Sequence, residues 1–287
     1  MKIHFLKSNW NDVIIIESNN NYILVDTGFE DKYNAINDFF KKRNVDKISY
    51  IIITHFHLDH YGSLEKILNN YKVDNVIIKE YSGLDITDAD GKTTTEEYRN
   101  KEYNHYLDIV NLINKKSKLI KPKEKEIIVF EKLKLIFYNT KNLIKDSYND
   151  KTSKDYKKIK YNENYNSLVL QIEYNDFNIL LTGDITDNEE ENNIMSKLNY
   201  QIANIVNKEI DIYKVSHHGD DKNNSQETLN IYKPKYAVFT NNYNEINNNN
   251  NMIKKLKKAN NKVKLLYAGD SNIEIEITDK IKTNTNC

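Results

Sequence analysis

The sequence predicts an α/β (α+β) protein in which two β-sheets pack together and helices cover their outer faces. Runs rich in β-branched residues alternate with segments of helical periodicity in both halves of the 287-residue chain. Each half also contains strand hairpins. Because no Pro/Gly-rich linker and no repeat of solenoid period interrupts the pattern, we expect residues 1–287 to form a single domain.

The first quarter of the chain supplies strands separated by Asn-rich turns, followed by helices with one apolar face. In one of these helices, apolar residues recur at Leu64, Ile67, Leu68 and Tyr71, which is the spacing of a single helix face. In chain order we expect strands at 3–6, 13–17 and 22–25, a helix at 33–40, a strand at 48–53, a helix at 64–71 and a strand at 76–78.

Residues 85–119 differ from this pattern, because their apolar residues form a helical stripe in a polar, charged background. We interpret this segment as a helical insertion that packs on the core as a lid. The second half then returns to strands. We expect hairpins at 127–130/133–138 and 167–173/177–182, a polar loop at 141–161, a helix near 188–198, a strand at 210–215, a helix at 229–232 and strands at 236–240, 263–266 and 273–277.

Composition narrows the class of protein. Lys+Arg and Asp+Glu both number 42, so the formal net charge is zero, which argues against a strongly basic nucleic-acid-binding surface. The single cysteine, Cys287, excludes an intramolecular disulfide and a Cys-rich zinc finger within this sequence. With neither a signal-peptide pattern at the start nor an apolar run long enough to span a bilayer, we expect a cytoplasmic protein with no membrane contact.

The strongest chemical signal is Thr54-His55-Phe56-His57-Leu58-Asp59-His60, which directly follows an apolar strand. Imidazole nitrogens and carboxylate oxygens are the ligands of catalytic zinc sites. A loop leaving a strand can turn His55 and His57 toward one centre, while Asp59 and His60 serve a second metal nearby. Two metals about 3.5–4 Å apart can clamp a hydrolytic transition state.

Two further segments follow later strands. Leu181-Thr182-Gly183-Asp184 delivers a carboxylate through a glycine turn, which suits a bridge between two metals. Val215-Ser216-His217-His218-Gly219 places two adjacent histidines at a strand end, where one can ligate a metal and its neighbour can contact substrate. Four of the seven glycines lie beside these segments, as tight turns around such a site require.

In this order, the His55-x-His57-x-Asp59-His60 motif, Asp184 and the His217-His218 pair resemble the metallo-β-lactamase superfamily. The strand end Val25-Asp26-Thr27-Gly28 and the position of Asp12 resemble the N-terminal hairpin of that fold. The segments around Asn164 and Lys214 are similar to a narrower branch, which includes the hydrolase domain of the bacterial competence (DNA-uptake) channel protein and choline-phosphate esterases. The resemblance implies a four-layer αββα sandwich with the site at one edge between the sheets.

The resemblance also implies roles for individual residues. His55 and His57 would bind a first metal, Asp59 and His60 a second, and Asp184 would bridge them. His217 or His218 would complete the second site; we favour His218 as the ligand and His217 as the catalytic and substrate contact. The superfamily's usual third histidine of the first metal site is absent from residues 162–167, where Asn164 or Asn166 points into the site instead and binds substrate.

We therefore expect a metal-dependent hydrolase that uses a metal-bound hydroxide, with Asp59 orienting or deprotonating the water. The cofactor is expected to be Zn²⁺, two per chain, with Mn²⁺ or Fe as alternatives. The expected substrate is a phosphodiester or phosphomonoester, either a small molecule or a nucleic acid. The alternatives are hydrolysis of an ester, lactone or thioester, or a metal-binding regulatory module with little turnover; the oligomeric state is left open.

Other candidates are interpreted as structural. We expect His4 to be a buried histidine with its hydrogen bonds satisfied, and His105 to lie on the polar face of the inserted helix. Asp26-Thr27-Gly28 is the tripeptide of aspartic proteases, but those need two copies, so we interpret Asp26 as a turn-stabilising group near the metal loop. We interpret the tyrosines of 98–106 as core and helix surface.

Overall fold

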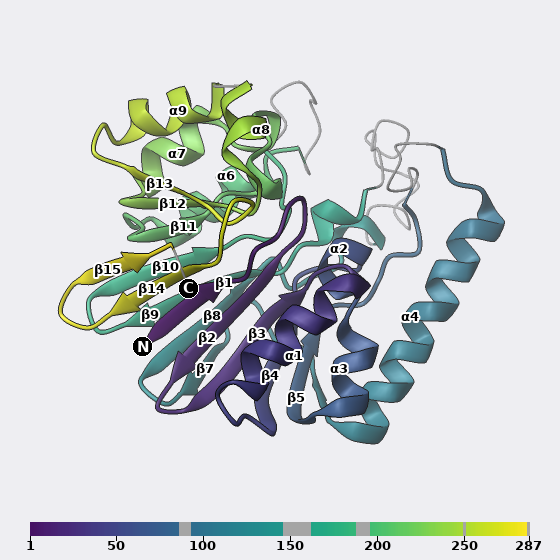
Figure 1. Cartoon of the computed structure of the whole chain (residues 1–287). Helices are drawn as coiled ribbons and strands as arrows, with labels where there is room; N and C mark the ends of the chain where they lie inside the picture. Colours follow the sequence, from purple (N-terminus) through teal and green to yellow (C-terminus); the bar gives the residue numbers. More distant parts are fainter. Residues whose placement is uncertain (86–92, 146–161, 188–195, 249–250, 286–287) are drawn as a thin grey trace.

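A computed structural model shows two sheets packed face to face, with helices outside both (Figure 1). It describes residues 1–85, 93–145, 162–187, 196–248 and 251–285. The first sheet has the strand order β15-β14-β1-β2-β3-β4-β5-β6 and the second the order β13-β12-β11-β10-β9-β8-β7. This arrangement confirms the predicted αββα fold class.

The strands of the first sheet are β1 Lys2–Phe5, β2 Val13–Ser18, β3 Asn21–Thr27, β4 Lys47–Ile53, β5 Lys72–Ile78, β6 Lys118–Ile120, β14 Ile273–Ile277 and β15 Ile281–Asn284. Those of the second are β7 Ile127–Phe130, β8 Leu133–Tyr138, β9 Val169–Tyr174, β10 Phe177–Leu181, β11 Ile212–Lys214, β12 Tyr236–Phe239 and β13 Lys264–Tyr267. The α-helices are α1 Tyr33–Lys41, α2 Leu58–Tyr61, α3 Leu64–Asn70, α4 Glu96–Lys116, α6 Leu198–Val206, α7 Gln226–Tyr232, α8 Tyr243–Asn248 and α9 Asn251–Ala259.

Three apolar clusters explain why the layers stay together. One lies between the two sheets and takes alternate residues such as Ile14 and Ile16 from β2. A second packs the other face of the first sheet, including Ile15, against α1, α3 and α4. A third packs the second sheet against α6, α7 and α9. Strands buried on both faces read as continuous apolar runs, as β2 and β4 do.

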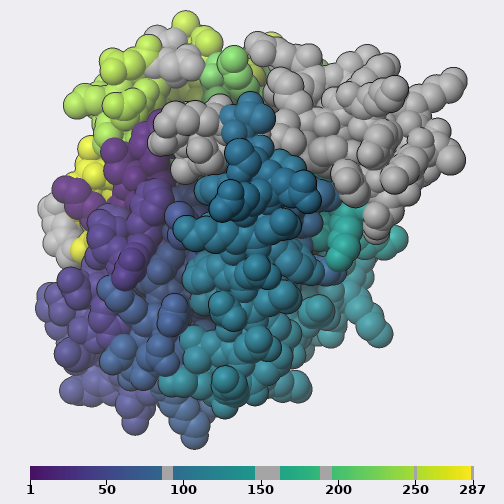
Figure 2. Space-filling model, turned by 90° about the vertical axis from the view of Figure 1, so that its right-hand side faces the viewer, coloured from purple at the N-terminus to yellow at the C-terminus, as the bar shows by residue number. Residues whose placement is uncertain are grey.

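The inserted segment contains one long helix. Helix α4 packs Tyr106, Ile109 and Ile113 into the cluster on the first sheet, beside α3. Figure 2 faces this side of the molecule and shows the residues of α4 spread over much of it. The apolar stripe read from the sequence is therefore the face by which the helix attaches to the sheet.

Some elements differ from those the sequence predicted. Two short strands, β6 and β15, were not expected; both lie at edges of the first sheet, where few apolar contacts are needed to hold a strand. The helix expected near 188–198 falls largely outside the described residues, and the helix seen here, α6, begins at Leu198. Residues 146–161 of the expected polar loop, residues 86–92 of the inserted segment and Cys287 also lie outside them.

Strand direction determines where the polar segments meet. Strands β3 and β4 are parallel, as are β10, β11 and β12. The carboxyl ends of parallel neighbours lie at the same edge of a sheet. The loops after β4, β10 and β11 therefore come together at one edge of the sandwich. There Leu168 N donates to Thr54 O (2.7 Å), which joins the two halves of the chain.

Candidate metal centre

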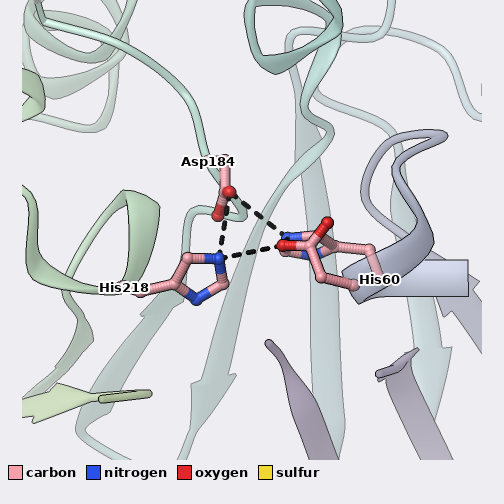
Figure 3. Close-up of side chains that lie close together, drawn as sticks. His60, Asp184 and His218 are labelled. Atoms are coloured by element: carbon pink, nitrogen blue, oxygen red, sulfur yellow. Dashed lines mark hydrogen bonds and ion pairs between the residues drawn. The ribbon is translucent and has the colours of Figure 1, made fainter. Parts of the chain in front are cut away.

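Four side chains from three loops converge at this edge. Asp59 and His60 lie on α2, directly after β4; Asp184 follows β10 and His218 follows β11. Each offers a ligand atom, and these atoms all lie within 4.8 Å of one another. Figure 3 shows His60, Asp184 and His218 pointing toward one another from separate elements. We call Asp59, His60, Asp184 and His218 the four-ligand cluster.

The four distances between a histidine nitrogen and a carboxylate oxygen in the four-ligand cluster are close to those between the ligands of a tetrahedral ion. His60 Nε2 is 3.2 Å from Asp59 Oδ2 and 3.3 Å from Asp184 Oδ2. His218 Nε2 is 3.1 Å and 3.2 Å from the same two oxygens. Ligands bound about 2.0–2.1 Å from a tetrahedral ion stand about 3.3 Å apart, so these four spacings are those expected of atoms that share one ion.

The hydrogen bonding of His60 also indicates a metal site. His60 is fully buried, and its Nε2 has no hydrogen-bond partner among the described residues. An unpaired buried polar atom costs about 1–3 kcal/mol, so such atoms in native proteins call for an explanation. A metal ion between the four ligand atoms would supply the missing partner.

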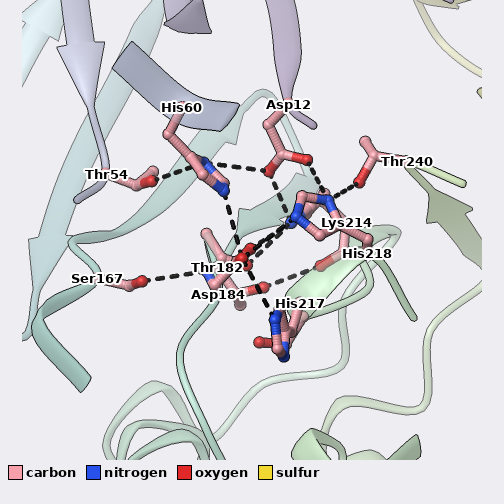
Figure 4. A network of polar contacts seen from close by, with 12 residues as sticks. Asp12, Thr54, His60, Ser167, Thr182, Asp184, Lys214, His217, His218 and Thr240 are labelled. Atoms are coloured by element: carbon pink, nitrogen blue, oxygen red, sulfur yellow. Dashed lines mark hydrogen bonds and ion pairs between the residues drawn. The ribbon is translucent and has the colours of Figure 1, made fainter. Parts of the chain in front are cut away.

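A second layer of polar groups orients both histidines (Figure 4). His60 Nδ1 donates to Asp26 Oδ2 (2.8 Å), and Asp26 is held in turn by the backbone N and Oγ1 of Thr54 (both 2.8 Å). His218 Nδ1 lies 2.9 Å from Thr240 Oγ1 and 3.2 Å from Asp12 Oδ1. Because the Nδ1 atoms are engaged, each imidazole turns Nε2 toward the cluster, as metal-binding histidines commonly do.

Lys214 balances the buried negative charge behind the site. Its ammonium lies 2.6 Å from Asp12 Oδ2 and 3.4 Å from Asp184 Oδ1, and it donates to Gly183 O (2.9 Å). Burial disfavours the charged lysine, but Asp12 and Asp184 outweigh it and raise the pKa of Lys214. Burial likewise acts against the charged carboxylate of Asp12, but Lys214 and His218 hold its pKa well below the usual value.

The acidic groups also set the protonation of the cluster when no ion is bound. Burial disfavours the charged imidazoles, yet the surrounding carboxylates raise the pKa values of His60 and His218 well above the usual value. Burial opposes ionisation of Asp184, but His218 and His60 lower its pKa well below the usual value. The centre is thus built to hold positive charge between two carboxylates, whether that charge is carried by protons or by a cation.

His55 and His57 form a separate pair beside the four-ligand cluster. His55 Nε2 lies 3.0 Å from His57 Nδ1, and the rings of His55 and His60 are 4.1 Å apart. The outer nitrogen of His57 donates to Asp85 Oδ2 (3.0 Å), and that of His55 lies 3.1 Å from Thr54 Oγ1. When both outer nitrogens carry hydrogen, the two facing nitrogens present lone pairs to each other, an arrangement that a cation or a shared proton stabilises.

Asp85 also affects the charge of His57. Burial disfavours the charged ring, but the adjacent carboxylate outweighs it and raises the pKa of His57 to about 9. Burial, followed by repulsion from His60 and His57, lowers the pKa of His55 well below its usual value. The two imidazoles therefore differ in charge although they lie in contact.

Backbone conformation brings the loops this close together. Gly183 has φ +53°, and a Cβ at that position would come 2.9 Å from Thr54 Cβ. His217 and His218 have φ values of 51° and 53°, in the left-handed region that non-glycine residues seldom adopt. Such strained backbone is held by its surroundings and is common at functional sites.

The residues expected to contact substrate take different positions. His217 lines the pocket; its Nε2 is 3.8 Å from Asp184 Oδ2, and its Nδ1 is held by the amide of Asn223 (2.7 Å). Asn164 also lines the pocket, with Nδ2 3.4 Å from His217 Nε2. Asn166 lies behind the site, where its amide donates to Glu80 O (2.9 Å) and to Glu163 Oε1 (2.7 Å).

A cavity of about 430 Å³ opens onto these groups. Asp59, Asp184, His217 and His218 form one part of its wall, and His57 lies beside them. The remaining wall is largely aromatic and apolar. Concave, mainly apolar sites with a few convergent polar groups are typical of small-molecule binding.

Comparison with known proteins fits this geometry. The family model described as the metallo-beta-lactamase superfamily matches residues 11–133. The metallo-beta-lactamase fold-containing protein ST1585 of Sulfurisphaera tokodaii is 34% identical over 79 residues, which is 28% of either chain. Part of the chain, mainly its first half, is therefore similar to the metallo-β-lactamase superfamily.

Solved structures show the same fold. The metallo-beta-lactamase fold protein YhfI of Bacillus subtilis aligns with a TM-score of 0.53 and 11% identity over 93% of this chain and 96% of its own. CmlA, a diiron β-hydroxylase of Streptomyces venezuelae, aligns with a TM-score of 0.54 and 10% identity over 96% of this chain. This chain spans 54% of the CmlA chain, about half its length. The chain therefore has the metallo-β-lactamase fold, with candidate metal ligands at one edge of its two sheets.

Several residues of the site were not singled out from the sequence. Asp85, Lys214 and Thr240 act on the candidate ligands, but each is an ordinary polar residue in its local sequence, and only the fold brings it to the site. Asp26 does more than stabilise a turn, because it orients His60. Tyr98, which we interpreted with the other tyrosines of α4 as core or surface, lines the pocket.

The remaining histidines lie apart from the site. His4 Nε2 is 3.1 Å from Glu17 Oε2 on the neighbouring strand, so it has a structural partner. His105 on α4 packs against the rings of Phe56 and Tyr61. Among the described residues, no helix has the length and apolar character needed to cross a membrane.

Proposed function

We propose that this protein is a metal-dependent hydrolase of phosphoesters, with its metal ion held by the four-ligand cluster. The observation that carries the proposal is the convergence of four ligand atoms at the wall of a substrate-sized pocket, among them the buried His60 Nε2, which faces two carboxylates without a hydrogen bond to either. Two nitrogen and two oxygen donors suit Zn²⁺, with Mn²⁺ or Fe as alternatives.

A bound divalent ion would supply Lewis acidity and lower the pKa of a water molecule, which are the two effects a hydrolase needs at neutral pH. The protein's own contribution is to fix the ligands. Asp26 and Thr240 hold the outer nitrogens of His60 and His218, and Lys214 offsets the charge of Asp184. Asp59, whose side chain is 21% exposed, is the member of the cluster that faces the pocket most openly.

His217 is placed to act on the substrate rather than on the ion. The Asn223 amide nitrogen lies closer to Nδ1 (2.7 Å) than the Asn164 amide nitrogen does to Nε2 (3.4 Å), which favours the neutral ring that accepts at Nδ1 and carries its hydrogen on Nε2. Burial lowers the pKa of His217, and this favours that neutral form. In the proposed reaction, His217 Nε2 donates a hydrogen bond to an oxygen of the substrate as negative charge develops on it.

His55 and His57 provide a second, less complete metal position. Two imidazole nitrogens face each other there at 3.0 Å, and a cation that binds between them would replace the proton that the His57 ring shares with His55. Among the described residues, the pair has no third ligand atom within the spacing of the four-ligand cluster. We therefore propose that a second ion binds here more weakly than the first.

Hydrolysis of a carboxylic ester, lactone or thioester is the second candidate. It is favoured by the pocket wall, which has no lysine or arginine among the described residues that line it. Phosphate groups are commonly gripped by such cations. The same metal centre and the same His217 would serve either reaction.

The test begins with metal-free protein, to which Zn²⁺, Mn²⁺ or Fe²⁺ is added. Hydrolysis of bis-p-nitrophenyl phosphate is then compared with that of p-nitrophenyl butyrate. The proposal expects metal-dependent turnover of the phosphodiester that is lost in His218→Ala and kept in His105→Ala, a control that removes an imidazole outside the site. Turnover of the butyrate alone would favour the second candidate, and turnover of neither would overturn the proposed function.

A further inference from the structure

We propose that the pocket selects substrates by the substituent next to the bond that is hydrolysed, which we call the arm of the substrate. The selected arm is apolar and carries no negative charge of its own. This inference deepens the proposed function and rests on it, since it assumes that the pocket next to the four-ligand cluster holds the substrate. It makes nucleic acids, whose arms are polyanionic, poor substrates. The argument uses the shape, the exposure and the charge of the pocket wall.

Large apolar side chains line the pocket although they face solvent. Trp10, Phe29, Leu58 and Tyr98 are 45%, 39%, 48% and 37% exposed, and all four line this one cavity. They come from four separate segments: the β1–β2 loop, the β3–α1 connection, the start of α2 and the start of α4. Exposed apolar groups gathered from distant segments mark a binding surface rather than chance exposure.

The apolar wall continues inward. Phe56 and Tyr81, which are 4% and 2% exposed, line the same cavity, and their rings are 5.1 Å apart. Phe56 precedes His57 in the metal loop, so this aromatic floor lies beside the second metal position. A substrate arm that leaves the metal centre in this direction is in contact with aromatic faces from the outset, which favours an aryl or alkyl group.

The charge of the wall is negative. Glu102 lines the cavity, and no lysine or arginine does so among the described residues. Asp85 also lines it but is paired with His57, and a bound ion would offset the two carboxylates of the four-ligand cluster. Tyr98 and Glu102 are four residues apart on α4, which places them on one side of that helix. Glu102 is half-buried on α4, and its carboxylate is the acidic group of this wall that belongs neither to the four-ligand cluster nor to the His57 pair.

The apolar contacts and the negative charge of the pocket wall both favour an apolar, uncharged arm. An aromatic arm gains contact area from Tyr98, Phe56 and Tyr81, whereas an arm with its own phosphate meets the negative charge of Glu102. A carboxylate-lined cleft with low-dielectric walls repels anions more strongly than an open surface does. The selection concerns the arm of the substrate, so it applies whether the hydrolysed bond is a phosphoester or a carboxylic ester.

Two matched pairs of diesters separate contact from charge, and all four share p-nitrophenol as leaving group. Phenyl and methyl p-nitrophenyl phosphate differ in the apolar arm. Thymidine 5′-(p-nitrophenyl phosphate), with and without a 3′-phosphate, differs in added charge. We expect the phenyl ester to exceed the methyl ester in kcat/KM by about tenfold, and the 3′-phosphate to lower kcat/KM.

Variants on α4 identify the residues responsible. Tyr98→Ala is expected to remove most of the phenyl preference, and Glu102→Lys to reverse the effect of the 3′-phosphate. Glu97→Lys, an exposed position of the same helix outside the pocket, makes the same charge change and is expected to leave both ratios as in the unaltered protein. A 3′-phosphate that raises kcat/KM, or Glu102→Lys ratios equal to those of Glu97→Lys, would overturn the inference.

Failure of the proposed function gives a different result from failure of this inference. If none of the four diesters is cleaved, the proposed phosphoesterase function is wrong. Arm selection is then read from binding of phenylphosphonate and methylphosphonate to the metal-loaded protein by calorimetry. Tighter binding of the phenyl compound that Tyr98→Ala abolishes upholds the inference, and equal binding of the two compounds overturns it.

Discussion

Replacing Lys214 by Met tests whether the charge network behind the metal centre is as tightly coupled as its distances indicate. Lys214 is fully buried and its ammonium lies 2.6 Å from Asp12 Oδ2. Methionine has a similar length and no charge, so the change leaves Asp12 buried without its main counter-ion. Removing one partner of a buried ion pair typically costs about 3–5 kcal/mol. Domains are stable by about 5–15 kcal/mol, so we expect a large fraction of the stability to be lost.

The assay is urea unfolding of chelator-treated protein at neutral pH, followed by circular dichroism. Lys208→Met is the control, because Lys208 pairs with Glu173 at 2.5 Å but its side chain is 50% exposed. Exposed ion pairs contribute about 0–1 kcal/mol, so this variant should unfold close to the unaltered protein. Adding Asp12→Asn to Lys214→Met removes the uncompensated charge, and the double variant is expected to be more stable than Lys214→Met alone.

Two results would refute this reasoning. One is a Lys214→Met protein whose free energy of unfolding lies within about 1 kcal/mol of that of the control variant. A buried carboxylate at Asp12 that has lost its counter-ion should destabilise the protein by more than this. The other is a double variant less stable than the single one, which would mean that the Asp12 carboxylate still stabilises the protein without the lysine, through its contact with His218. If Lys214→Met does not accumulate, the double variant is compared with Asp12→Asn.

Four further predictions follow from the same geometry. His217→Ala should keep its metal content but lose about 10²-fold or more in kcat, measured with a p-nitrophenyl ester; a loss of metal instead would make His217 a ligand. Apparent metal affinity should rise with pH, because His60 and His218 have raised pKa values and the ion must displace their protons. The rise is up to about tenfold per pH unit for each proton displaced. Competition with a chelating dye at pH 6 and pH 8 measures it, and equal affinities at the two pH values would contradict the prediction. Asp85→Asn should weaken binding of the second, looser metal about 10–100-fold, seen as a shifted late phase in a metal titration, without changing the first phase. Gly219→Ala should lower the melting temperature, since φ is +103° there and a Cβ would come 2.5 Å from a phenyl ring; an unchanged melting temperature would show that this turn relaxes freely.

Much of the fold could be predicted because its strands are buried on both faces. Apolar runs such as Val13–Glu17 and Ile48–Ile53 have no other stable place than the interior of a layered structure, and the helix pattern of 64–71 has one apolar face. Edge strands such as β6 and β15 bury little apolar surface, so their sequences carried no comparable signal.

The metal centre was predictable in part because its ligands lie directly after strands. Parallel strand ends share one edge of a sheet, which brings Asp184 and His218 together after β10 and β11. Asp59 and His60 follow β4 in the other sheet, and their place beside this pair was predicted only through the family resemblance. Asp85 was not predictable, since its contact with His57 depends on the path of a polar segment before α4. The roles of Trp10 and Glu102 are likewise invisible in sequence, because a pocket wall assembled from separate loops has no period.

Metal content tests the central claim most directly. The unaltered protein and Asp184→Ala are each purified without chelator, desalted and analysed by plasma mass spectrometry, with His105→Ala as the control. The four-ligand cluster predicts about one firmly held divalent ion per chain in the unaltered and control proteins, and little or none in Asp184→Ala. An unaltered protein that retains no metal even after incubation with Zn²⁺, Mn²⁺ or Fe²⁺, or an Asp184→Ala protein with undiminished metal, would contradict the account.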